Sequence, residues 1–519
     1  MAVRTIVERI NRRRTRAAPE FRDRIAELVA EIDELDPRVG EAVRQRVTAI
    51  VRALTGVQVD REDTSTAVTS LIRSLTPMYG AGAWLLLATI DGRLPSMGRV
   101  EAVVRSAELD GTDGAVIDVI SSRMREPDAP QSWLTVRILA GRKLVDVQHT
   151  SRADFATGIQ RVTREVTRRW FETQNVVLVG WRDDLSAMRA LTPNESHRAR
   201  WGGPPVEIPD DDPIIVPWRC TYILPELAAE VVRAAHLQTM AMHSGSTLNM
   251  IGYDLVPITT AETSHEGLVP GFARNLAAAK YARVIVPISA AAAGEYRGWR
   301  AMLAGTGLAG PRIESILLPN QAPPENPAAT AAARARLQVG VLPLVLVVGS
   351  HEPRKNHLAV LHAAELLWRE GQLFSLSFIG GNSWNSETFT ETLAGLQAIG
   401  RPVEAVSAAS DDILWGGYRV ARFTIFPSLN EGYGLPVAES LSCGTPVVTS
   451  NFGSMKEIAD AGGGAVLVDP RNDHSIADGM RSLLIDDELH SRLSREARSR
   501  PLRTWDTYAS ETWELLTGQ

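Results

Sequence analysis

The stretch that most constrains the fold lies near the C-terminal end of the chain. Its first four residues, Phe423-Thr424-Ile425-Phe426, predict a buried strand. Two glycines, Gly432 and Gly434, follow in a turn, and residues 437–443 predict a short helix that Gly444 ends. Strand, glycine turn and helix in this order are typical of a parallel α/β sheet.

This turn also predicts a ligand site. Glycine lets the backbone approach a ligand closely, and the amides at a helix start attract an anion. Glu431 precedes the turn, and Glu439 lies on the helix, where a carboxylate suits a hydroxylated group such as a ribose. Tyr433 and Leu435 complete the backbone that would face the anion. We expect a nucleotide diphosphate here, with Glu431 near the group that reacts.

Two cations stand at the end of another predicted strand. Arg354 and Lys355 follow the apolar run 344–348 and Gly349, just before a predicted helix. Lysine occurs at only four positions in the chain, so Lys355 is not compositional background. A planar guanidinium and a compact ammonium are complementary ways to hold a diphosphate and to neutralise it as it departs.

A second α/β pattern lies in the first half of the chain. Its predicted strands and helix are 134–139, 143–147, 158–171 and 176–181, of which 158–171 is the helix. Ligands bind such sheets at the carboxyl ends of the strands, which makes His149, Gly158 and Arg161 candidates to contact a substrate. Gly158 as a simple helix cap remains an alternative.

Length and composition exclude several classes of protein. A length of 519 residues suggests about three domains. A net charge of −6 gives no case for nucleic acid, and Cys220 and Cys443 are too few for a disulfide framework or a cysteine zinc site. No secretory signal is visible, and the apolar run 83–90 is too short to span a bilayer. We expect a cytoplasmic protein.

The first 130 residues predict helices and no catalytic cluster. The Arg12-Arg13-Arg14 cluster suits a peripheral contact with the inner face of an anionic membrane, but a solvated helix face is the simpler interpretation. Glycines and a proline between 80 and 98 punctuate the region. Residues 182–217 predict loops, and the aspartates 210–212 predict a turn rather than a metal site.

Two further segments predict no site of their own. Residues 305–310 match the GxGxxG dinucleotide pattern, but a predicted helix precedes them and a predicted strand, 313–318, follows them, the reverse of what that motif needs. Residues 319–326 predict a proline-rich linker, in which Asn320 is a weak candidate for a contact.

The motifs together resemble a known family. The segment from Asn430 to Glu439, with Gly444-Thr445-Pro446 after it, looks like the signature of retaining glycosyltransferases of family 4. The resemblance extends in order over about 140–519 and includes three more segments: Glu352-Pro353-Arg354-Lys355-Asn356, Thr157-Gly158-Ile159-Gln160-Arg161-Val162 and Asp254-Leu255-Val256-Pro257.

The resemblance implies an α/β chain of the GT-B fold, with two Rossmann-like parallel-sheet domains that face a cleft. The expected regions are a helical N-terminal region, an acceptor domain, a donor domain and a closing crossover helix: 1–130, 131–325, 326–503 and 504–519. It also implies a catalytic set of Glu431, Arg354 and Lys355. The implied donor contacts are Gly349, Arg354, Lys355, Gly432, Tyr433, Gly434, Leu435 and Glu439.

On the acceptor side, the resemblance implies His149, Gly158, Arg161, Tyr253 and Asp254. Tyr253 departs from the family, many members of which have a histidine there. No metal or cofactor is implied beyond the nucleotide sugar, with GDP or UDP as its nucleotide. The expected function is transfer of a hexose, first of all mannose from GDP-mannose, to a glycan or lipid-linked acceptor in surface polysaccharide synthesis.

Two alternatives remain. A non-catalytic sugar-nucleotide-binding or scaffold protein of a polysaccharide assembly system would keep the donor site and work through its helical region. A GT-B epimerase or phosphorylase is less favoured, because the lysines of the second half are poorly placed for pyridoxal chemistry. Donor binding without turnover would distinguish the first alternative from an enzyme.

Overall fold

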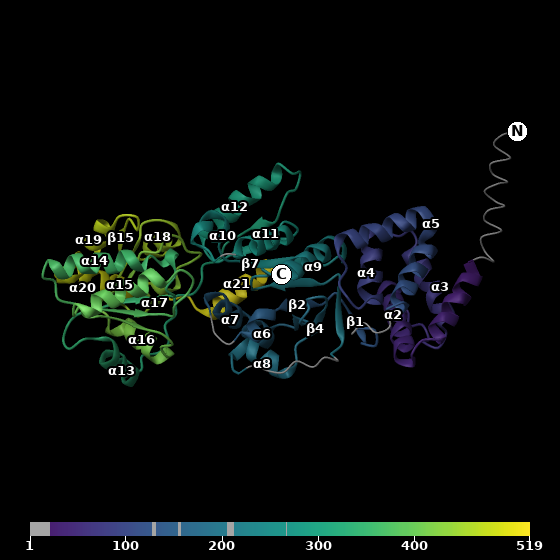
Figure 1. The fold of residues 1–519 in the computed structure, drawn as a ribbon, viewed down its shortest axis with the longest axis horizontal. Coiled ribbons are helices and arrows are strands. Elements are labelled where there is room, and N and C mark those ends of the chain that lie inside the picture. Colours follow the sequence, from purple (N-terminus) through teal and green to yellow (C-terminus); the bar gives the residue numbers. More distant parts are fainter. Residues whose placement is uncertain (1–20, 127–130, 154–156, 205–211, 266, 519) are drawn as a thin grey trace. The chain divides into compact units, whose positions relative to one another are not determined.

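A computed structural model describes residues 21–518 apart from 127–130, 154–156, 205–211 and 266 (Figure 1). The Arg12-Arg13-Arg14 cluster, Asp210 and Asp211 lie outside the described residues. The chain divides into two compact units, the first formed by residues 1–250 with 274–283 and the second by 251–273 with 284–519. No helix among the described residues is long and apolar enough to cross a membrane.

The first unit begins with helices, as predicted. Residues 21–33 are helical, and four helices follow: α2(Pro37–Thr55), α3(Thr64–Leu75), α4(Gly80–Ile90) and α5(Met97–Met124), the last broken at Gly111 with φ 89°. The glycines predicted to punctuate this region lie at helix starts, since Gly80 begins α4 and Gly98 is the second residue of α5. A Cβ on Gly80 would lie 2.6 Å from His243 Nδ1, so close packing of α4 explains this glycine.

A nine-stranded sheet begins with seven strands in the order β1-β5-β4-β3-β2-β6-β7 and ends with β8 and β9, whose bounds are given below. The seven are β1(Val136–Ala140), β2(Lys143–Asp146), β3(Val176–Trp181), β4(Met188–Ala190), β5(Ile214–Trp218), β6(Thr221–Leu224) and β7(Thr247–Gly252). All neighbours among these seven are parallel except those of β4.

The helices of the first unit protect the edge of this sheet. On α2, the Gln45 side chain donates to the Val136 carbonyl at 2.8 Å and accepts from the Val136 amide at 3.2 Å. One side chain thus pairs both backbone groups of Val136, the first residue of the edge strand β1. The helical region and the sheet are therefore parts of one packed unit.

The segments between the strands hold more regular structure than predicted. Helix α6(Gln148–Arg152) replaces the expected loop after β2, and β4, α8(Pro193–Trp201) and β5 occupy the region predicted as loops. Helix α8 carries a capping box from Thr192 to Glu195 and a proline at its first position, a signal that is visible in the sequence. Strand β6 was also not predicted.

The second unit contains a six-stranded parallel sheet in the order β12-β11-β10-β13-β14-β15. Its strands are β10(Leu344–Val348), β11(Ser375–Ile379), β12(Val403–Val406), β13(Phe423–Phe426), β14(Val447–Ser450) and β15(Ala465–Val468). The apolar runs 344–349, 375–381, 403–406, 423–426, 446–449 and 465–468 predict strands, and all six are confirmed. Their alternation with helices packs two apolar clusters, and Phe374, Phe378 and Phe423 are fully buried in the larger one.

Helices connect these strands. They are α13(Pro327–Leu337), α14(His357–Arg369), α15(Glu387–Ala398), α16(Asp411–Val420), α17(Leu435–Ser442), α18(Gly453–Asp460), α19(Asp473–Ile485), α20(Asp487–Arg498) and α21(Trp505–Thr517). The sequence did not predict α13, although Asn326 caps it and Pro327 begins it. The predicted linker over 319–326 has no regular structure, as expected.

Further helices and short strands lie before the linker, and the first of them continues to Thr173, past its predicted end at residue 171. They are α7(Gly158–Thr173), α9(Val231–His243), α10(Val256–Thr259), η1(Ala261–Thr263), α11(Leu268–Ala279), β8(Val284–Pro287), α12(Ala290–Ala304) and β9(Arg312–Ile313). The strand predicted over 313–318 ends after Ile313, because Ile316 makes only a single backbone bond, to Pro287. The GxGxxG segment is turn and irregular backbone, as predicted.

Candidate nucleotide-sugar site

Glu431 lies at the centre of a charged cluster in the second unit. Its Oε2 is 2.7 Å from Arg354 Nη1, and its Oε1 is 2.5 Å from Lys355 Nζ and accepts from Ser428 Oγ at 2.7 Å. Its side chain is only 9% exposed. Burial opposes ionisation, but the two cations outweigh it and lower the pKa of Glu431 to about 2. The carboxylate is therefore ionised at neutral pH.

Arg354 clamps two loops together. It lies in the 3-10 turn η2(Pro353–Lys355) after β10, and its guanidinium bonds the Asn430 carbonyl at 2.7 Å and pairs with Glu352 at 2.6 Å. In return, the Leu429 amide donates to the Arg354 carbonyl at 2.8 Å. Burial opposes its charge, but Glu431 and then Glu352 outweigh that and raise the pKa of Arg354. Much of its hydrogen-bonding capacity is spent within the protein.

Lys355 makes fewer hydrogen bonds within the protein than Arg354 does. Its ammonium contacts Glu431 and lies 5.0 Å from the ring centre of Phe426. An ammonium has three N–H donors, and among the described residues one of them is used in a hydrogen bond. Of the two cations, Lys355 is thus better placed to accept an additional anion.

Asp254 lies beside the glycine turn. A Cβ on Gly432 would be 2.8 Å from Asp254 Oδ2, so only glycine permits this approach. Burial raises the pKa of Asp254 to about 6, with Glu431 and Glu295 adding to the rise and Arg354 opposing it. The sequence grouped Asp254 with the acceptor side, whereas the structure places it next to Gly432.

Glu295, on α12, secures the Asp254 segment. Its Oε2 accepts from the Leu255 amide at 2.8 Å, and its Oε1 lies 3.2 Å from Thr259 Oγ1 and 3.4 Å from Asn430 Nδ2. It joins the segment after β7 to the loop that carries Glu431. Sequence reasoning missed Glu295 because no motif surrounds it.

The predicted glycines allow backbone conformations and close backbone contacts that a side chain would prevent. Gly434, with φ 97°, is the residue before α17 and takes the left-handed conformation. Gly349, with φ 146°, passes so close to Gly380 that a Cβ on Gly380 would lie 1.9 Å from the Gly349 carbonyl oxygen. The amides at the start of α17, beginning at Leu435, follow Glu431 directly.

Tyr433 and Glu439 have buried side chains. The Tyr433 hydroxyl donates to the Leu318 carbonyl at 3.0 Å, so this side chain anchors the turn and only its backbone is left for a ligand. Glu439, on α17, accepts from the Tyr418 hydroxyl at 2.7 Å and is 8% exposed. Asn320 bonds the Pro501 carbonyl and the Arg503 amide, contacts that fix the linker.

The remaining predicted residues are divided between the units. His149, Gly158 and Arg161 belong to the first unit, and Tyr253, which is 7% exposed, belongs to the second. Gly158 is the first residue of α7 rather than its cap. Thr157 is the cap, in a capping box with Gln160, so the simple-cap interpretation of Gly158 was wrong.

His149 is held by carboxylates. Its Nε2 lies 2.9 Å from Glu230 Oε1, and its amide donates to Glu226 at 2.8 Å. Burial lowers the pKa of His149, but the bond to Glu230 and the charge of Glu226 outweigh burial, so the pKa is raised. The same ion pair, with Arg233, lowers the pKa of Glu230 to about 2 against its burial.

The sequence missed the fully buried network behind His149. Arg233 pairs with Asp146 and Glu226, each at 2.9 Å, and Asp146 also accepts from the Trp181 indole at 2.9 Å and the Tyr222 hydroxyl at 2.5 Å. These residues are far apart in sequence, so no local signal could reveal the network. It fixes α6 at the carboxyl ends of β2 and β6.

No cluster of three or more metal-binding side chains occurs among the described residues. The groups around the Glu431 carboxylate are instead two cations, Arg354 and Lys355, and the Ser428 hydroxyl, in the loop that leads into α17. This set suits a phosphorylated ligand that also carries a polar reactive group.

Comparison with known proteins gives the class. Over 73% of this chain, the fold matches the structure of Alr3699/HepE from Anabaena in complex with UDP and glucose, with a TM-score of 0.53, 12% identity and all of that chain covered. Sucrose-phosphate synthase from Thermosynechococcus elongatus matches with a TM-score of 0.51 and 17% identity over 73% of this chain and 98% of the other. The fold is GT-B, as predicted.

Sequence comparison gives the family. Residues 334–500 match the model of the glycosyl transferases group 1 family. The serotype-specific mannosyltransferase WbdA of Escherichia coli is 28% identical over 342 residues, 61% of this chain and 38% of its own length. The D-inositol 3-phosphate glycosyltransferase of Acidothermus cellulolyticus is 36% identical over 187 residues, 34% of this chain and 41% of its own. The chain thus spans well under half the length of these relatives.

Residues 334–500 therefore carry a domain of the group 1 glycosyltransferase family. The prediction of that group and of the GT-B fold is confirmed. Family 4 within the group stays a prediction.

Proposed function

We propose that the protein is a retaining glycosyltransferase of family 4 that takes a hexose from a nucleotide sugar. The first donor to consider is GDP-mannose, because relatives such as WbdA are named mannosyltransferases. The acceptor would be a glycan or a lipid-linked glycan in surface polysaccharide synthesis. The proposed setting is the cytoplasm, with a peripheral contact at the membrane, and no cofactor is needed beyond the donor.

One observation carries the proposal: a buried, ionised Glu431 pairs with Arg354 and Lys355 in the loop that leads into α17. A diphosphate at the helix start would meet the Leu435 amide and the ammonium of Lys355. Arg354 is already bound by Glu352 and Asn430. It would therefore act by holding Glu431 in position and by its own positive charge. The site would thus stabilise the negative charge that develops on the leaving nucleotide.

The two carboxyl groups next to the turn differ in charge state. Glu431 is ionised, whereas Asp254 has a pKa of about 6. A permanent carboxylate suits the sugar side, where positive charge develops at the anomeric carbon, and a carboxyl that titrates near neutrality can exchange a proton. Glu439 would hold the ribose, with the Tyr418 hydroxyl orienting its carboxylate.

The test is a turnover assay with the purified full-length chain and a panel of GDP-, UDP- and dTDP-sugars. Hydrolysis or transfer of one donor is expected. Lys355→Met should lower kcat by about 100-fold or more, because it removes one donor to the developing charge. Lys456→Met is the matched control, since Lys456 is an exposed lysine of the same unit whose contact is Asp460 on its own helix.

Glu431→Gln keeps the shape of the side chain and removes its charge, and we expect a similar loss. Full activity of both Lys355→Met and Glu431→Gln would overturn the assignment of this site. Binding of a donor without turnover, across the panel and with glycan acceptors present, would favour the non-catalytic alternative.

A further inference from the structure

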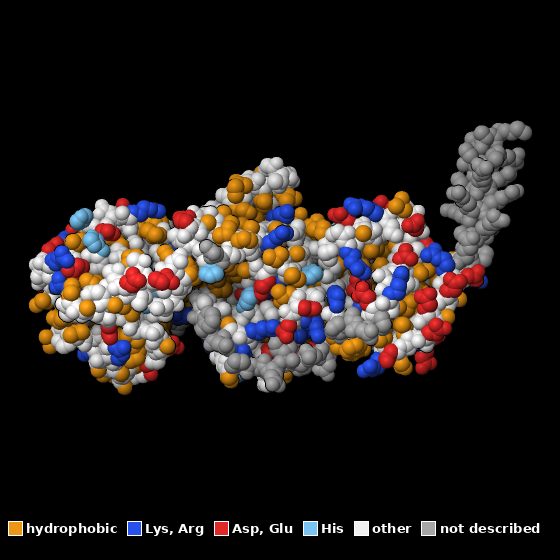
Figure 2. Space-filling view, viewed as in Figure 1, with side chains coloured by type: hydrophobic (Ala, Val, Ile, Leu, Met, Phe, Trp, Pro, Cys, Tyr) orange, Lys and Arg blue, Asp and Glu red, His pale blue; other side chains and the backbone are white. Residues whose placement is uncertain are grey.

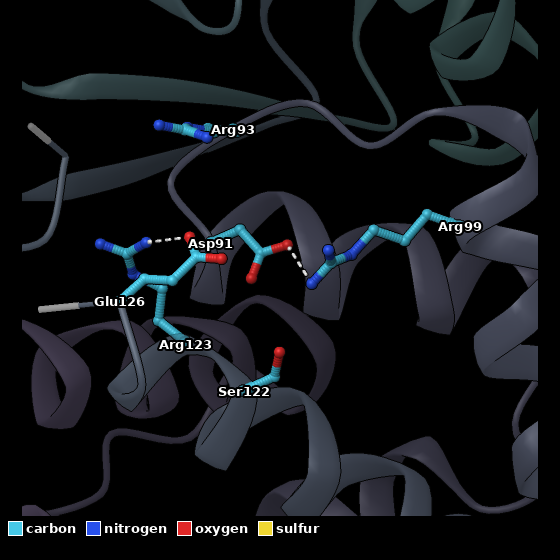
Figure 3. A pocket seen from close by; sticks show the side chains of 6 residues that line it. All are labelled: Asp91, Arg93, Arg99, Ser122, Arg123 and Glu126. Carbon is cyan, nitrogen blue, oxygen red and sulfur yellow. Dashed lines mark ion pairs between the residues drawn. The ribbon is translucent and has the colours of Figure 1, made fainter. Parts of the chain in front are cut away.

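A polar pocket opens in the helical part of the first unit, and none of the residues assigned above lines it. It has a volume of about 70 Å³ and is lined by Asp91, Arg93, Arg99, Ser122, Arg123 and Glu126. Figure 3 shows these side chains converging from the end of α4, the segment after it and α5. Such a gathering of arginines in a concave site is a candidate anion site.

Cations outnumber carboxylates in this pocket. Three arginines and two carboxylates line it, and Arg46, fully buried behind it, adds a fourth guanidinium. With both carboxylates ionised, two positive charges remain. Burial and the charge of Arg123 lower the pKa of Arg46 to about 10, so it is still protonated at neutral pH.

The carboxylates neutralise this charge incompletely. Asp91 pairs with Arg99 at 3.1 Å, while Glu126 is 3.8 Å from Arg123 and has a side chain that is 69% exposed. In Figure 3 these two ion pairs are drawn and Arg93 has none. Neither Arg93 nor Arg46 makes an ion pair with any described residue.

Neighbouring arginines on the surface behave differently. Figure 2 shows basic and acidic side chains interspersed over the N-terminal helices, and several of these are ion pairs, for example Arg44 with Asp33 and Arg105 with Glu101. Surface arginines of this region thus have carboxylate partners and also water around them. In the pocket, Arg99 and Arg123 also have carboxylate partners, whereas Arg93 and Arg46 have none among the described residues.

Packing explains some of the arginines but not all of them. Arg46 bonds the carbonyls of Ile90 and Leu134, each within 2.9 Å, so it ties α2 to the segments around it. Arg123 donates to Ser132. Arg93 makes one bond among the described residues, to the Gln131 side chain at 2.9 Å, and its buried Nε has no partner there. Its guanidinium is therefore available to a ligand.

We propose that this pocket binds a phosphate group, either as a soluble phosphate or as the phosphate of a lipid headgroup. Arg93 and Arg123 would donate to the phosphate oxygens, and the Ser122 hydroxyl, exposed at the rim, would add a neutral donor. A dianion matches the two positive charges that the protein leaves uncompensated. The pocket gives the helical region a ligand of its own, distinct from the donor of the transfer reaction.

The test measures binding of inorganic phosphate to the full-length chain by calorimetry. Arg93→Gln should weaken binding about tenfold or more, because a charge-assisted bond is lost. Arg105→Gln, which removes an exposed arginine of α5, is the matched control and should leave binding unchanged. Ser122→Asp adds a carboxylate at an exposed position of the rim, so it should abolish binding without disturbing the fold.

Two further arms separate this site from the donor site and the two ligand sources from each other. Binding of phosphate should persist in Lys355→Met. Co-sedimentation with phosphatidylcholine vesicles, with and without phosphatidic acid, tests whether the ligand is a lipid headgroup. The pocket is assigned to a lipid if the protein binds only vesicles with phosphatidic acid and if both Arg93→Gln and Ser122→Asp abolish this binding. The proposal is overturned if neither phosphate nor the acidic vesicles bind, or if the pocket variants bind them as the wild type does.

Discussion

Replacing Arg354 by glutamine should destabilise the second unit through the carboxylates it leaves behind. Arg354 is the largest of the contributions that lower the pKa of Glu431 from 4.5 to about 2. At 1.36 kcal/mol per pKa unit, that depression corresponds to about 3 kcal/mol of stability at neutral pH. The value agrees with the roughly 3–5 kcal/mol expected when one partner of a buried ion pair is removed.

The pH dependence of this stabilisation has a definite sign. The folded-state pKa of Glu431 is depressed, so its contribution is fully present above pH 4.5 and is lost as the pH falls toward 2. The difference between the wild type and Arg354→Gln should therefore shrink in acid.

The assay is the thermal midpoint of the full-length chain at neutral pH. A loss of about 3 kcal/mol lowers the midpoint by roughly 6–12 °C in a unit of this size. Arg369→Gln is the control, because Arg369 is 71% exposed and its pair with Glu365 should contribute less than about 1 kcal/mol.

A double variant separates buried charge from lost packing. Arg354→Gln with Glu431→Gln should recover part of the loss, because no carboxylate is then left unpaired at that position. The reasoning is refuted if Arg354→Gln shifts the midpoint no more than Arg369→Gln does, or if the double variant is less stable than the sum of the single changes predicts.

Three other perturbations test the surroundings of the site. Asp254→Asn should raise the thermal midpoint above about pH 6 and leave it unchanged below pH 3.8. The pKa of Asp254 is raised in the folded state, so its ionisation destabilises the wild type as the pH rises between those two values. A midpoint difference that is independent of pH would contradict this. Gly432→Ala should cost about 1–3 kcal/mol by pressing on Asp254, whereas Gly395→Ala, on an open part of α15, should stabilise, as urea unfolding would show. His357→Leu should stabilise by about 1–3 kcal/mol, since neither buried ring nitrogen has a partner among the described residues. Burial lowers the pKa of His357 to about 3, so the wild type should lose stability as the pH falls below 6.5. The His357→Leu variant should lose less stability over the same pH range. Equal acid sensitivity of the two proteins would contradict this explanation.

The segment of the family domain could be predicted well from its sequence, because its signals are local. Strands β10 to β15 are short apolar runs that end at glycines or polar residues. The turn from Glu431 to Gly434 can be recognised from its two glycines. Helix α3 begins and ends at the predicted residues, since Asp63 caps its start. Between residues 182 and 217, by contrast, a capped helix and two short strands were hidden among prolines and glycines.

Sequence by itself determined the alternation of strands and helices, the glycine turn, and the pair of cations that follows β10, because backbone conformation and hydrophobic period depend on neighbours in the chain. Only the tertiary structure decided which of these groups meet. Asp254 lies against Gly432, Glu295 joins their two segments, and Arg354 is committed to Glu352 and Glu431. Charge states follow from such contacts and from burial, so the ionised Glu431, the titratable Asp254 and the arginine pocket of the helical region emerge only once the chain is folded.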